Sequence, residues 1–395
     1  MTASETIKAH GLDGTLVAPD WPPLTQDEVR RVMDAFGGFH APYEILSASP
    51  RPLSAAGIVG TRNARVFLKR HARAVRDTNG LREEHRFMAH LLNHGAPVPQ
   101  VIPANTGETS LEIDGWTYEV QELAAGIDLY EDAISWTPFR TASHAYSTGE
   151  IMAKFHLAAK RYDAPPRTGR PLVAGFSIYS AADPAAEMER YIVARPALGA
   201  YLAQRSCVED ALVLLAPFHQ ELAHYLPHLA PLWTHNDFHA SNLFWCGRGA
   251  DARATAVIDF GLCDRTNAVH DLAHAIERNI VEWLVLVNNP ARPGDVPVHV
   301  DHLWAFLAGY ESVRPLTRYE ASALAPMTAL CHAEFALSET DYFLSVLHSE
   351  ERAHKACEGY LVSHARWWRG PGTALLDLLR AWAAQQARDE GAEPR

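Results

Sequence analysis

A change in hydrophobic pattern near Gly126 divides the sequence into two parts and limits the folds that the chain can adopt. Before this point, short alternating segments predict strands, with one helical segment among them. After it, long segments with helical spacing predominate. Strands grouped in one part and helices in the other predict an α+β fold, with a β-rich N-terminal lobe and a mostly helical C-terminal lobe.

The elements of the first part are expected in the order β-β-β-α-β-β. The pair Asp114-Gly115 lies between two alternating segments and is typical of a two-residue hairpin turn. Strands are expected at 43–49, 55–61, 64–71, 110–113 and 116–123, with a helix at 81–93. In the second part, helices are expected at about 142–160, 184–204, 207–226 and from 269 onward, with a strand pair at 242–245 and 255–260.

Two motifs in this second part carry the strongest functional signal. Asp237 lies two residues after His235 and five before Asn242, and an Asp-Phe-Gly motif follows at 259–261. This spacing matches the H-x-D-x-x-x-x-N and D-F-G pattern of phosphoryl-transfer sites. Each motif alone occurs by chance. Their order, and their places beside two paired strands, favour a functional site.

Phosphoryl transfer explains why these residue types occur together. The transferred group carries negative charge that Mg²⁺ neutralises, and Mg²⁺ prefers oxygen ligands such as those of Asn242 and Asp259. The attacking hydroxyl must lose a proton, and Asp237 is the candidate base. The sequence therefore predicts a nucleotide, Mg²⁺ and a hydroxyl-bearing acceptor at one site.

The first part contains candidates for the remaining half of such a site. A kinase-type site needs a lysine on the third strand and a glutamate on the following helix. Lys69 ends an alternating segment, and Glu84 lies on the same helix face as the apolar residues. Glu83 points about 100° away and is the second candidate. We expect Glu84 to hold Lys69 against the nucleotide phosphates.

On these motifs the chain resembles the aminoglycoside phosphotransferase and choline kinase family of small-molecule kinases, which are related to protein kinases. The resemblance covers about residues 43–379. It rests on Lys69, Glu84, the segments 235–242 and 258–261 and the His-Asp-Leu-Ala segment 270–273, with further similar stretches at 152–156 and 314–320. It implies a bilobal protein-kinase-like fold, with ATP and Mg²⁺ as cofactors.

The resemblance also implies a role for each matching residue. These roles are catalytic base for Asp237, magnesium ligand for Asn242 and Asp259, phosphate-binding lysine for Lys69, adenine-binding hinge for Gln121, Glu122 and Leu123, and structural support for His235 and Asp271. The expected domains are a leader with a short helix at 1–40, a nucleotide-binding lobe at 41–125 and a helical lobe with the catalytic loop and acceptor site at 126–395.

Two departures from the family pattern are visible. Position 236 is Asn where the family commonly has Gly, and Asn tolerates left-handed backbone angles better than most residues. The loop 47–54 lacks a G-x-G-x-x-G sequence. Phosphates at that loop would have to be bound by backbone N–H groups and serine hydroxyls.

Composition excludes several other classes of protein. The net charge of −12 gives no general attraction for a polyanion, which argues against a nucleic-acid-coating protein or a polybasic membrane binder and leaves a locally basic pocket open. No apolar run approaches the length of a bilayer span. The five cysteines form no C-x-x-C pair and fit a reducing cytoplasm best.

A small-molecule kinase has two alternatives, a protein kinase of the same fold and, from a different functional class, a protein without catalytic activity. A protein kinase needs a long activation segment, but only nine residues separate Gly261 from Asp271. A catalytically silent nucleotide-binding or scaffold protein should have lost at least one of the key residues. Those residues, Lys69, Asp237, Asn242 and Asp259, are all present.

The acceptor is predicted to carry an amine as well as a hydroxyl, as an aminoglycoside or other antibiotic, an amino alcohol or a homoserine-like molecule does. Glu334, Ser338 and Asp341 recur at helical spacing in an otherwise apolar segment, and Asp264 follows the Asp-Phe-Gly motif. These carboxylates are the candidate acceptor-binding residues. The stripe could equally be the solvated face of its helix.

Overall fold

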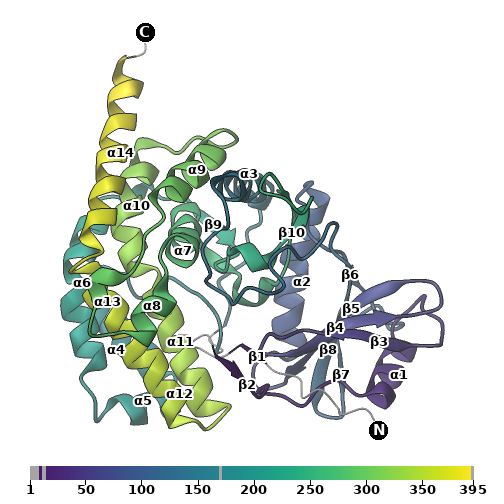
Figure 1. The fold of residues 1–395 in the computed structure, drawn as a ribbon. Helices are drawn as coiled ribbons and strands as arrows, with labels where there is room; N and C mark the ends of the chain where they lie inside the picture. Colours follow the sequence, from purple (N-terminus) through teal and green to yellow (C-terminus); the bar gives the residue numbers. More distant parts are fainter. Residues whose placement is uncertain (1–8, 11–14, 169–170, 393–395) are drawn as a thin grey trace.

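The structure is a computed structural model that describes residues 9–10, 15–168 and 171–392. Figure 1 shows a β-rich lobe and a larger helical lobe joined after strand β8 (Trp116–Glu122). The predicted α+β bilobal fold is confirmed. The candidate site residues lie where the two lobes meet.

The sheet of the first lobe has the strand order β3-β4-β5-β8-β6, and β7 also pairs with β8. Its other strands are β3 (Glu44–Ala48), β4 (Ala55–Gly60), β5 (Arg65–Ala72), β6 (Val101–Ile102) and β7 (Leu111–Ile113). Alternate residues such as Val66 and Leu68 point into a small core against helix α1 (Gln26–Ala35). Gly57 permits the close approach of β3, because a Cβ there would lie 2.2 Å from the Ser47 carbonyl oxygen.

Helix α2 (Thr78–Asn93) connects the sheet to the helical lobe. The Asp77 side chain accepts a hydrogen bond from the Gly80 N–H at 2.8 Å, so the helix begins three residues earlier than expected. Its buried face, which includes Glu84 and Met88, is turned toward the space between the lobes.

The second lobe is a stack of helices. They are α3 (Ala142–Ala159), α4 (Pro184–Val193), α5 (Pro196–Leu202), α6 (Cys207–Ala223), α7 (Ala268–Ile280), α8 (Trp283–Asn288), α9 (Val300–Glu311), α10 (Arg318–Leu330), α11 (His332–Ser345), α12 (Glu350–His354), a π-helix (Lys355–Val362), α13 (Ser363–Trp368) and α14 (Thr373–Ala392). Helices α3 and α9 cross at backbone contact, since a Cβ on Gly149 or Gly309 would lie about 2 Å from a carbonyl oxygen of the other helix.

Two pairs of short strands carry the predicted motifs in the helical lobe. Strand β9 (Pro231–Thr234) pairs with β12 (Asp264–Asn267), and β10 (Leu243–Cys246) pairs with β11 (Arg253–Val257). Only the second pair was expected. The first is hard to recognise in the sequence, because each of its strands has four residues and neither alternates clearly.

One expected helix, 184–204, is wrong as a single element. Helix α4 ends at Val193 and α5 begins at Pro196. Proline lacks the N–H that would continue the first helix, and it is favoured in the first turn of a new one.

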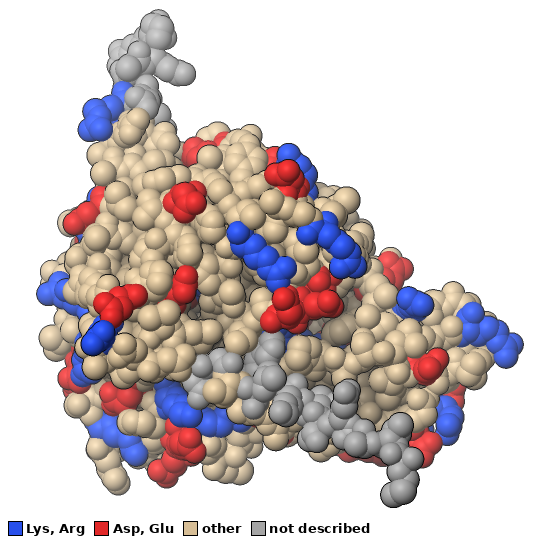
Figure 2. Space-filling model, viewed as in Figure 1, with Lys and Arg blue, Asp and Glu red and all other residues tan. Residues whose placement is uncertain are grey.

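Part of the leader bridges the two lobes. Trp21 packs edge-on against Trp116 of the sheet with ring centroids 5.5 Å apart, and the Pro22 carbonyl accepts a hydrogen bond from Arg70. Asp20 forms an ion pair with Arg352 of the helical lobe. The face in Figure 2 has acidic and basic side chains interspersed. Among the described residues, no helix is both long and apolar enough to span a membrane.

Candidate active site

The loop between β9 and β10 carries Asp237 at the junction of the lobes. The Asp237 N–H donates to His235 Nδ1 at 3.2 Å, and His235 Nε2 donates to the Ile258 carbonyl at 2.9 Å. These two bonds assign the proton of His235 to Nε2. His235 therefore links the Asp237 loop to the strand that precedes Asp259.

Asp271 lies beneath the same loop. Its carboxylate accepts hydrogen bonds from the N–H groups of His235, at 3.1 Å, and Asn236, at 2.7 Å. His156 contacts it at 2.9 Å and contacts the Tyr310 hydroxyl at 2.7 Å. Burial alone would raise the pKa of Asp271, but these hydrogen bonds lower it. Asp271 therefore stabilises the conformation of the loop through its two backbone N–H groups.

Asn236 replaces the glycine that is common in the family. Its φ of 60° lies in the left-handed region, where Asn is tolerated. Its side-chain oxygen accepts from the Thr234 hydroxyl at 2.8 Å. The substitution therefore keeps the backbone conformation that glycine would provide.

Asn242 and Asp259 present oxygen atoms beside Asp237. The Asn242 amide donates to the Asp237 carbonyl at 3.0 Å and to its carboxylate at 3.1 Å, which directs the amide oxygen away from Asp237. Asp259 has a φ of 61° and its carboxylate is 36% exposed, facing the space between the lobes. An amide and a carboxylate oxygen suit Mg²⁺, which takes few protein ligands and keeps water and phosphate oxygens as the others. These residues fit that ion, although no cluster of three or more His, Cys, Asp or Glu of the kind that holds a metal occurs in the described ranges.

Lys69 contacts Asp259 directly. Its ammonium lies 3.0 Å from Asp259 Oδ1. Burial alone would lower the pKa of Lys69, but the carboxylates of Asp259 and Glu119 raise it. Burial alone would raise the pKa of Asp259, but Lys69 lowers it to about 2. Both groups are therefore charged at neutral pH.

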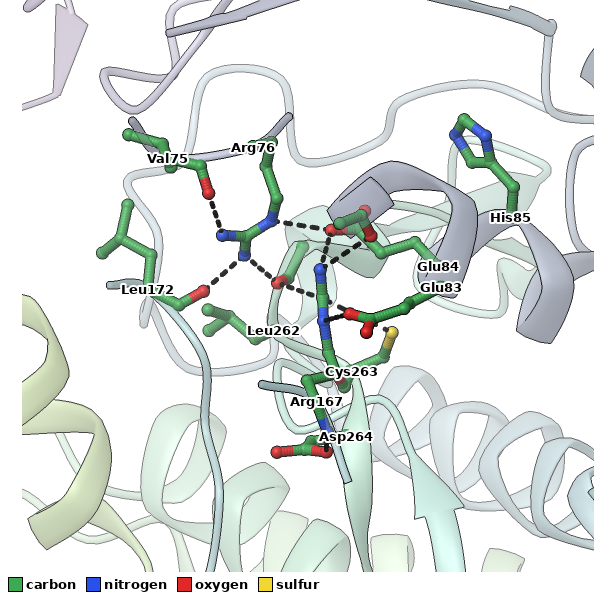
Figure 3. Close-up of polar contacts among 12 residues, drawn as sticks. Val75, Arg76, Glu83, Glu84, His85, Arg167, Leu172, Leu262, Cys263 and Asp264 are labelled. Atoms are coloured by element: carbon green, nitrogen blue, oxygen red, sulfur yellow. Dashed lines mark hydrogen bonds and ion pairs between the residues drawn. The ribbon is translucent and has the colours of Figure 1, made fainter. Parts of the chain in front are cut away.

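Glu84 does not hold Lys69 as expected. No ion pair between them occurs in the described part of the chain. Figure 3 shows two buried arginines on Glu84 instead, with Arg76 Nε at 2.7 Å and Arg167 at 2.6 Å from the same oxygen. Both guanidinium groups also donate to the Gly261 carbonyl, two residues after Asp259. Glu84 therefore ties helix α2 to the Asp-Phe-Gly loop, and Glu119, directly opposite Lys69 across the sheet, is the carboxylate nearer to that lysine.

Arg167→Met is expected to destabilise the protein by about 1.5–3 kcal/mol, because it removes charge-assisted hydrogen bonds while Arg76 still compensates Glu84. Urea unfolding measures this loss. Arg190→Met is the matched control, since Arg190 is 68% exposed in a surface pair that contributes about 0–1 kcal/mol. Equal losses in the two variants would show that the buried network contributes no more than a surface pair.

A cavity of ≈ 1010 Å³ lies between the sheet and the helical lobe. The predicted hinge residues Gln121, Glu122 and Leu123 line it. The serines of the loop 47–54 and the side chain of Lys69 also line this cavity. Its size and position suit a nucleotide, with the base at the hinge and the phosphates near Asp259.

A second cavity of ≈ 170 Å³ adjoins the first and shares Lys69, Asn242 and Asp259 with it. Asp237 lines only this second cavity, which extends into the helical lobe to Arg278 of α7 and Glu339 of α11. We call it the inner cavity.

The predicted acceptor residues Asp264, Glu334 and Asp341 lie outside the inner cavity. Glu334 accepts hydrogen bonds from the N–H groups of Ser177, at 2.6 Å, and Ile178, at 3.0 Å. Asp264 accepts the N–H of Arg167 at 2.8 Å, and Asp341 lies 3.9 Å from Arg195. Helix α11 is buried almost all round, and its opposite face, with Glu339, meets the cavity. A role of Asp264, Glu334 and Asp341 in acceptor binding stays a prediction.

Glu277 lies in the helical core beside Arg278. Burial raises the pKa of Glu277 to about 8. One oxygen lies 3.2 Å from His364 Nδ1, while the Arg278 Nε is 3.9 Å from the other, too far to hydrogen-bond. Burial also holds the pKa of His364 well below its usual value, so a protonated Glu277 can donate to the neutral imidazole.

Glu277→Gln is expected to flatten the pH dependence of stability between pH 5.5 and 7.5. In that range the folded protein keeps the Glu277 proton and the unfolded chain has lost it. The free energy of unfolding should therefore fall by about 1.4 kcal/mol per pH unit in the wild type relative to Glu277→Gln. Denaturant unfolding at several pH values measures the difference. If the free energy of unfolding changes with pH in the same way for the wild type and Glu277→Gln, the pKa of Glu277 is not raised.

Sequence patterns did not single out Arg278, Glu339 or Arg51. Arg51 lies in the loop 47–54 and lines both cavities, and its guanidinium donates to Ser135 at 2.7 Å. Arg278 follows the His-Asp-Leu-Ala segment by two turns, at a spacing that places it on the helix face of Asp271. That spacing was the available signal.

Comparisons with known proteins agree with this fold. The sequence profile of the phosphotransferase enzyme family matches residues 53–316. Among curated proteins, none matches the chain. The solved structures that share its fold include the following three. A microcompartment-associated aminopropanol kinase has 19% identity and a TM-score of 0.56 over 86% of this chain and 95% of its own. An amicoumacin kinase in complex with AMP-PNP and Ca²⁺ has 12% identity and a TM-score of 0.55 over 87% and 94%. An aminoglycoside phosphotransferase from Alicyclobacillus acidocaldarius has 14% identity and a TM-score of 0.51, over 92% of this chain and 98% of its own.

Proposed function

Because this chain belongs to the phosphotransferase enzyme family, we propose that it is an ATP-dependent kinase that transfers the γ-phosphate to a hydroxyl of a small molecule. One observation carries the proposal. A nucleotide-sized cavity and a smaller inner cavity meet at Asn242 and Asp259, with Asp237 on the inner side. A phosphoryl group passing from one molecule to another needs such a junction.

Each residue at the junction has a role in the proposed reaction. Asp237 accepts the proton of the acceptor hydroxyl as its oxygen attacks the γ-phosphorus. An oxygen–phosphorus bond forms to the acceptor, the bond between the γ-phosphorus and the bridging oxygen breaks, and ADP leaves with that electron pair. Lys69 binds phosphate oxygens. Asn242 and Asp259 would hold Mg²⁺, which neutralises charge on the phosphates when bound.

The nucleotide is proposed to bind with its adenine at the backbone of Gln121 to Leu123. The serines and backbone of the loop 47–54 face the same cavity and are proposed to contact the phosphates. Lys69 points to Asp259 from the sheet side, so a phosphate entering between them would meet a cation and a metal-binding carboxylate. All five cysteines are free, which suits the proposed cytoplasmic location.

The acceptor is proposed to bind in the inner cavity. If it carries an amine, Glu339 is the carboxylate in that cavity that neither the proton transfer nor the metal would occupy. Burial raises the pKa of Glu339 to about 7, and a nearby ammonium would favour its charged form. Glu339 thus replaces the acidic stripe as the amine-binding candidate.

An ADP-release assay tests the proposed function. The full chain, with ATP or GTP and Mg²⁺, is screened against aminoglycosides, amino alcohols, hydroxy amino acids and simple hydroxy acids. We expect acceptor-dependent ADP release with ATP for one class, and a phosphate monoester as the product by mass spectrometry. Tight ATP binding without transfer to any acceptor would favour the silent nucleotide-binding alternative.

A further inference from the structure

Arg278 is the most unusual side chain of the inner cavity. It is fully buried, and none of its three side-chain nitrogens makes a hydrogen bond of normal geometry within the described residues. It lies between aromatic rings, with its guanidinium carbon 5.5 Å from the centroid of Trp136 and 5.2 Å from that of Phe335. A buried cation without hydrogen-bonded partners is costly unless an anion compensates it.

The anion that Arg278 contacts in the free protein is Asp237. The guanidinium and this carboxylate are in direct contact at the inner end of the catalytic loop. Glu277 is 3.9 Å away, and Glu339 interacts only through space. In the proposed reaction, however, Asp237 must face the acceptor hydroxyl. Arg278 then needs a different anion in the same cavity.

The other cations that line this cavity have partners of their own in the protein, and Arg51 donates to Ser135 and interacts electrostatically with Asp128 and Asp259. Lys69 is paired with Asp259, Arg76 with Glu84, and Arg352 with Asp20 of the leader. Among the cations of the described residues that line the inner cavity, Arg278 is the fully buried one in direct contact with Asp237, the carboxylate that must accept the proton in the proposed reaction.

We infer that the acceptor carries a carboxylate as well as its hydroxyl, and that Arg278 binds this carboxylate in place of Asp237. A planar guanidinium can donate two parallel hydrogen bonds to a carboxylate, and burial between rings strengthens both. The inference rests on the proposed function and names the acceptor class: a small hydroxy acid, with or without an amine at Glu339.

The dimensions of the cavity agree with a small acceptor. Its ≈ 170 Å³ corresponds to about six water-sized groups at roughly 30 Å³ each. Its remaining walls include the apolar side chains of Ile134, Leu284 and Phe343. A chain of a few carbons between carboxylate and hydroxyl would contact these walls.

Binding of matched acids and amides tests the inference. The probes are hydroxy acids of three to six carbons, with and without an α-amine, and their primary amides, titrated into the full chain with Mg²⁺ and ADP by calorimetry. We expect at least one acid to bind 10-fold or more tightly than its amide. Arg278→Gln should remove that preference, and Arg278→Lys should keep part of it. Arg253→Gln is the matched control, because it removes the same charge from a side chain that is 68% exposed.

The outcomes separate this inference from the proposed function. Equal binding of acids and amides, or a preference kept in Arg278→Gln, overturns the carboxylate assignment. Release of ADP is measured in parallel. If an acid binds through Arg278 but no hydroxy compound yields ADP, the proposed function fails and the anion site stands. If Arg278→Gln does not bind ADP, the acids and amides are compared in the wild type and in Arg278→Lys. Equal binding of acids and amides by the wild type then refutes the inference.

Discussion

Asp237→Asn is expected to lower kcat by roughly 10²- to 10⁴-fold while leaving the KM for ATP nearly unchanged. Asparagine keeps the size of the side chain and can keep the contact with the Asn242 amide, but it cannot accept the hydroxyl proton. The loss should therefore appear in turnover and not in nucleotide binding. Steady-state ADP release with saturating acceptor measures it.

The same substitution also changes the environment of Arg278. Without the Asp237 carboxylate, its buried guanidinium loses the anion that it contacts. A carboxylate acceptor should then bind more tightly to Asp237→Asn than to the wild type, although it is turned over slowly. Asp163→Asn serves as the control, because its side chain is 87% exposed in a surface pair. Turnover of Asp237→Asn at the wild-type rate would show that Asp237 is not the base.

Asp259→Ala is expected to lower kcat/KM by roughly 10³-fold or more, because it would remove the charged ligand proposed for Mg²⁺, and a bound metal ion stabilises the transition state by several kcal/mol. The neutral Asn242 amide oxygen would remain alone. Calorimetric titration with ATP in the presence of Mg²⁺ should show weakened binding. A change of pH that restores part of the activity of Asp237→Asn should not restore Asp259→Ala.

Stability must be separated from metal binding in this variant, since Asp259→Ala also leaves the buried Lys69 without its 3.0 Å partner. The double variant Lys69→Met, Asp259→Ala removes both charges. The double variant should have a higher Tm than Asp259→Ala and should remain inactive. Recovery of activity together with stability would mean that Asp259 acts on the fold and not on the metal.

The buried network around Glu84 links the two lobes beside the larger cavity. Arg76 comes from the turn before α2, and Arg167 from the helical lobe, yet both bind Glu84 and the Gly261 carbonyl. A shift of α2 would therefore move the loop that carries Asp259. Lys69, which lies opposite Glu119 on paired strands, contacts Asp259 of the same loop.

Local sequence was sufficient for the catalytic loop and for most strands of the first lobe. The spacing of His235, Asp237 and Asn242 fixes a short loop whose groups bond to one another, such as the Asn242 amide to Asp237. Hairpin and alternation signals act between near neighbours as well. These features depend on contacts within a few residues, so a single sequence carries them.

Partners that come from distant parts of the chain were decided only by the tertiary structure. The sequence predicts that Glu84 pairs with Lys69. In the structure the Glu84 carboxylate instead accepts a hydrogen bond from Arg167, which lies 83 residues downstream. On α11 the burial of nearly every residue removes the contrast between a polar and an apolar face, so the sequence could not tell Glu334 from Glu339. Packing against residues 173–178 turns Glu334 inward to backbone N–H groups and leaves Glu339 at the cavity with Arg278. The residue types at the site follow from the chemistry that the sequence encodes, whereas their pairing depends on which buried charges the fold brings within hydrogen-bonding distance.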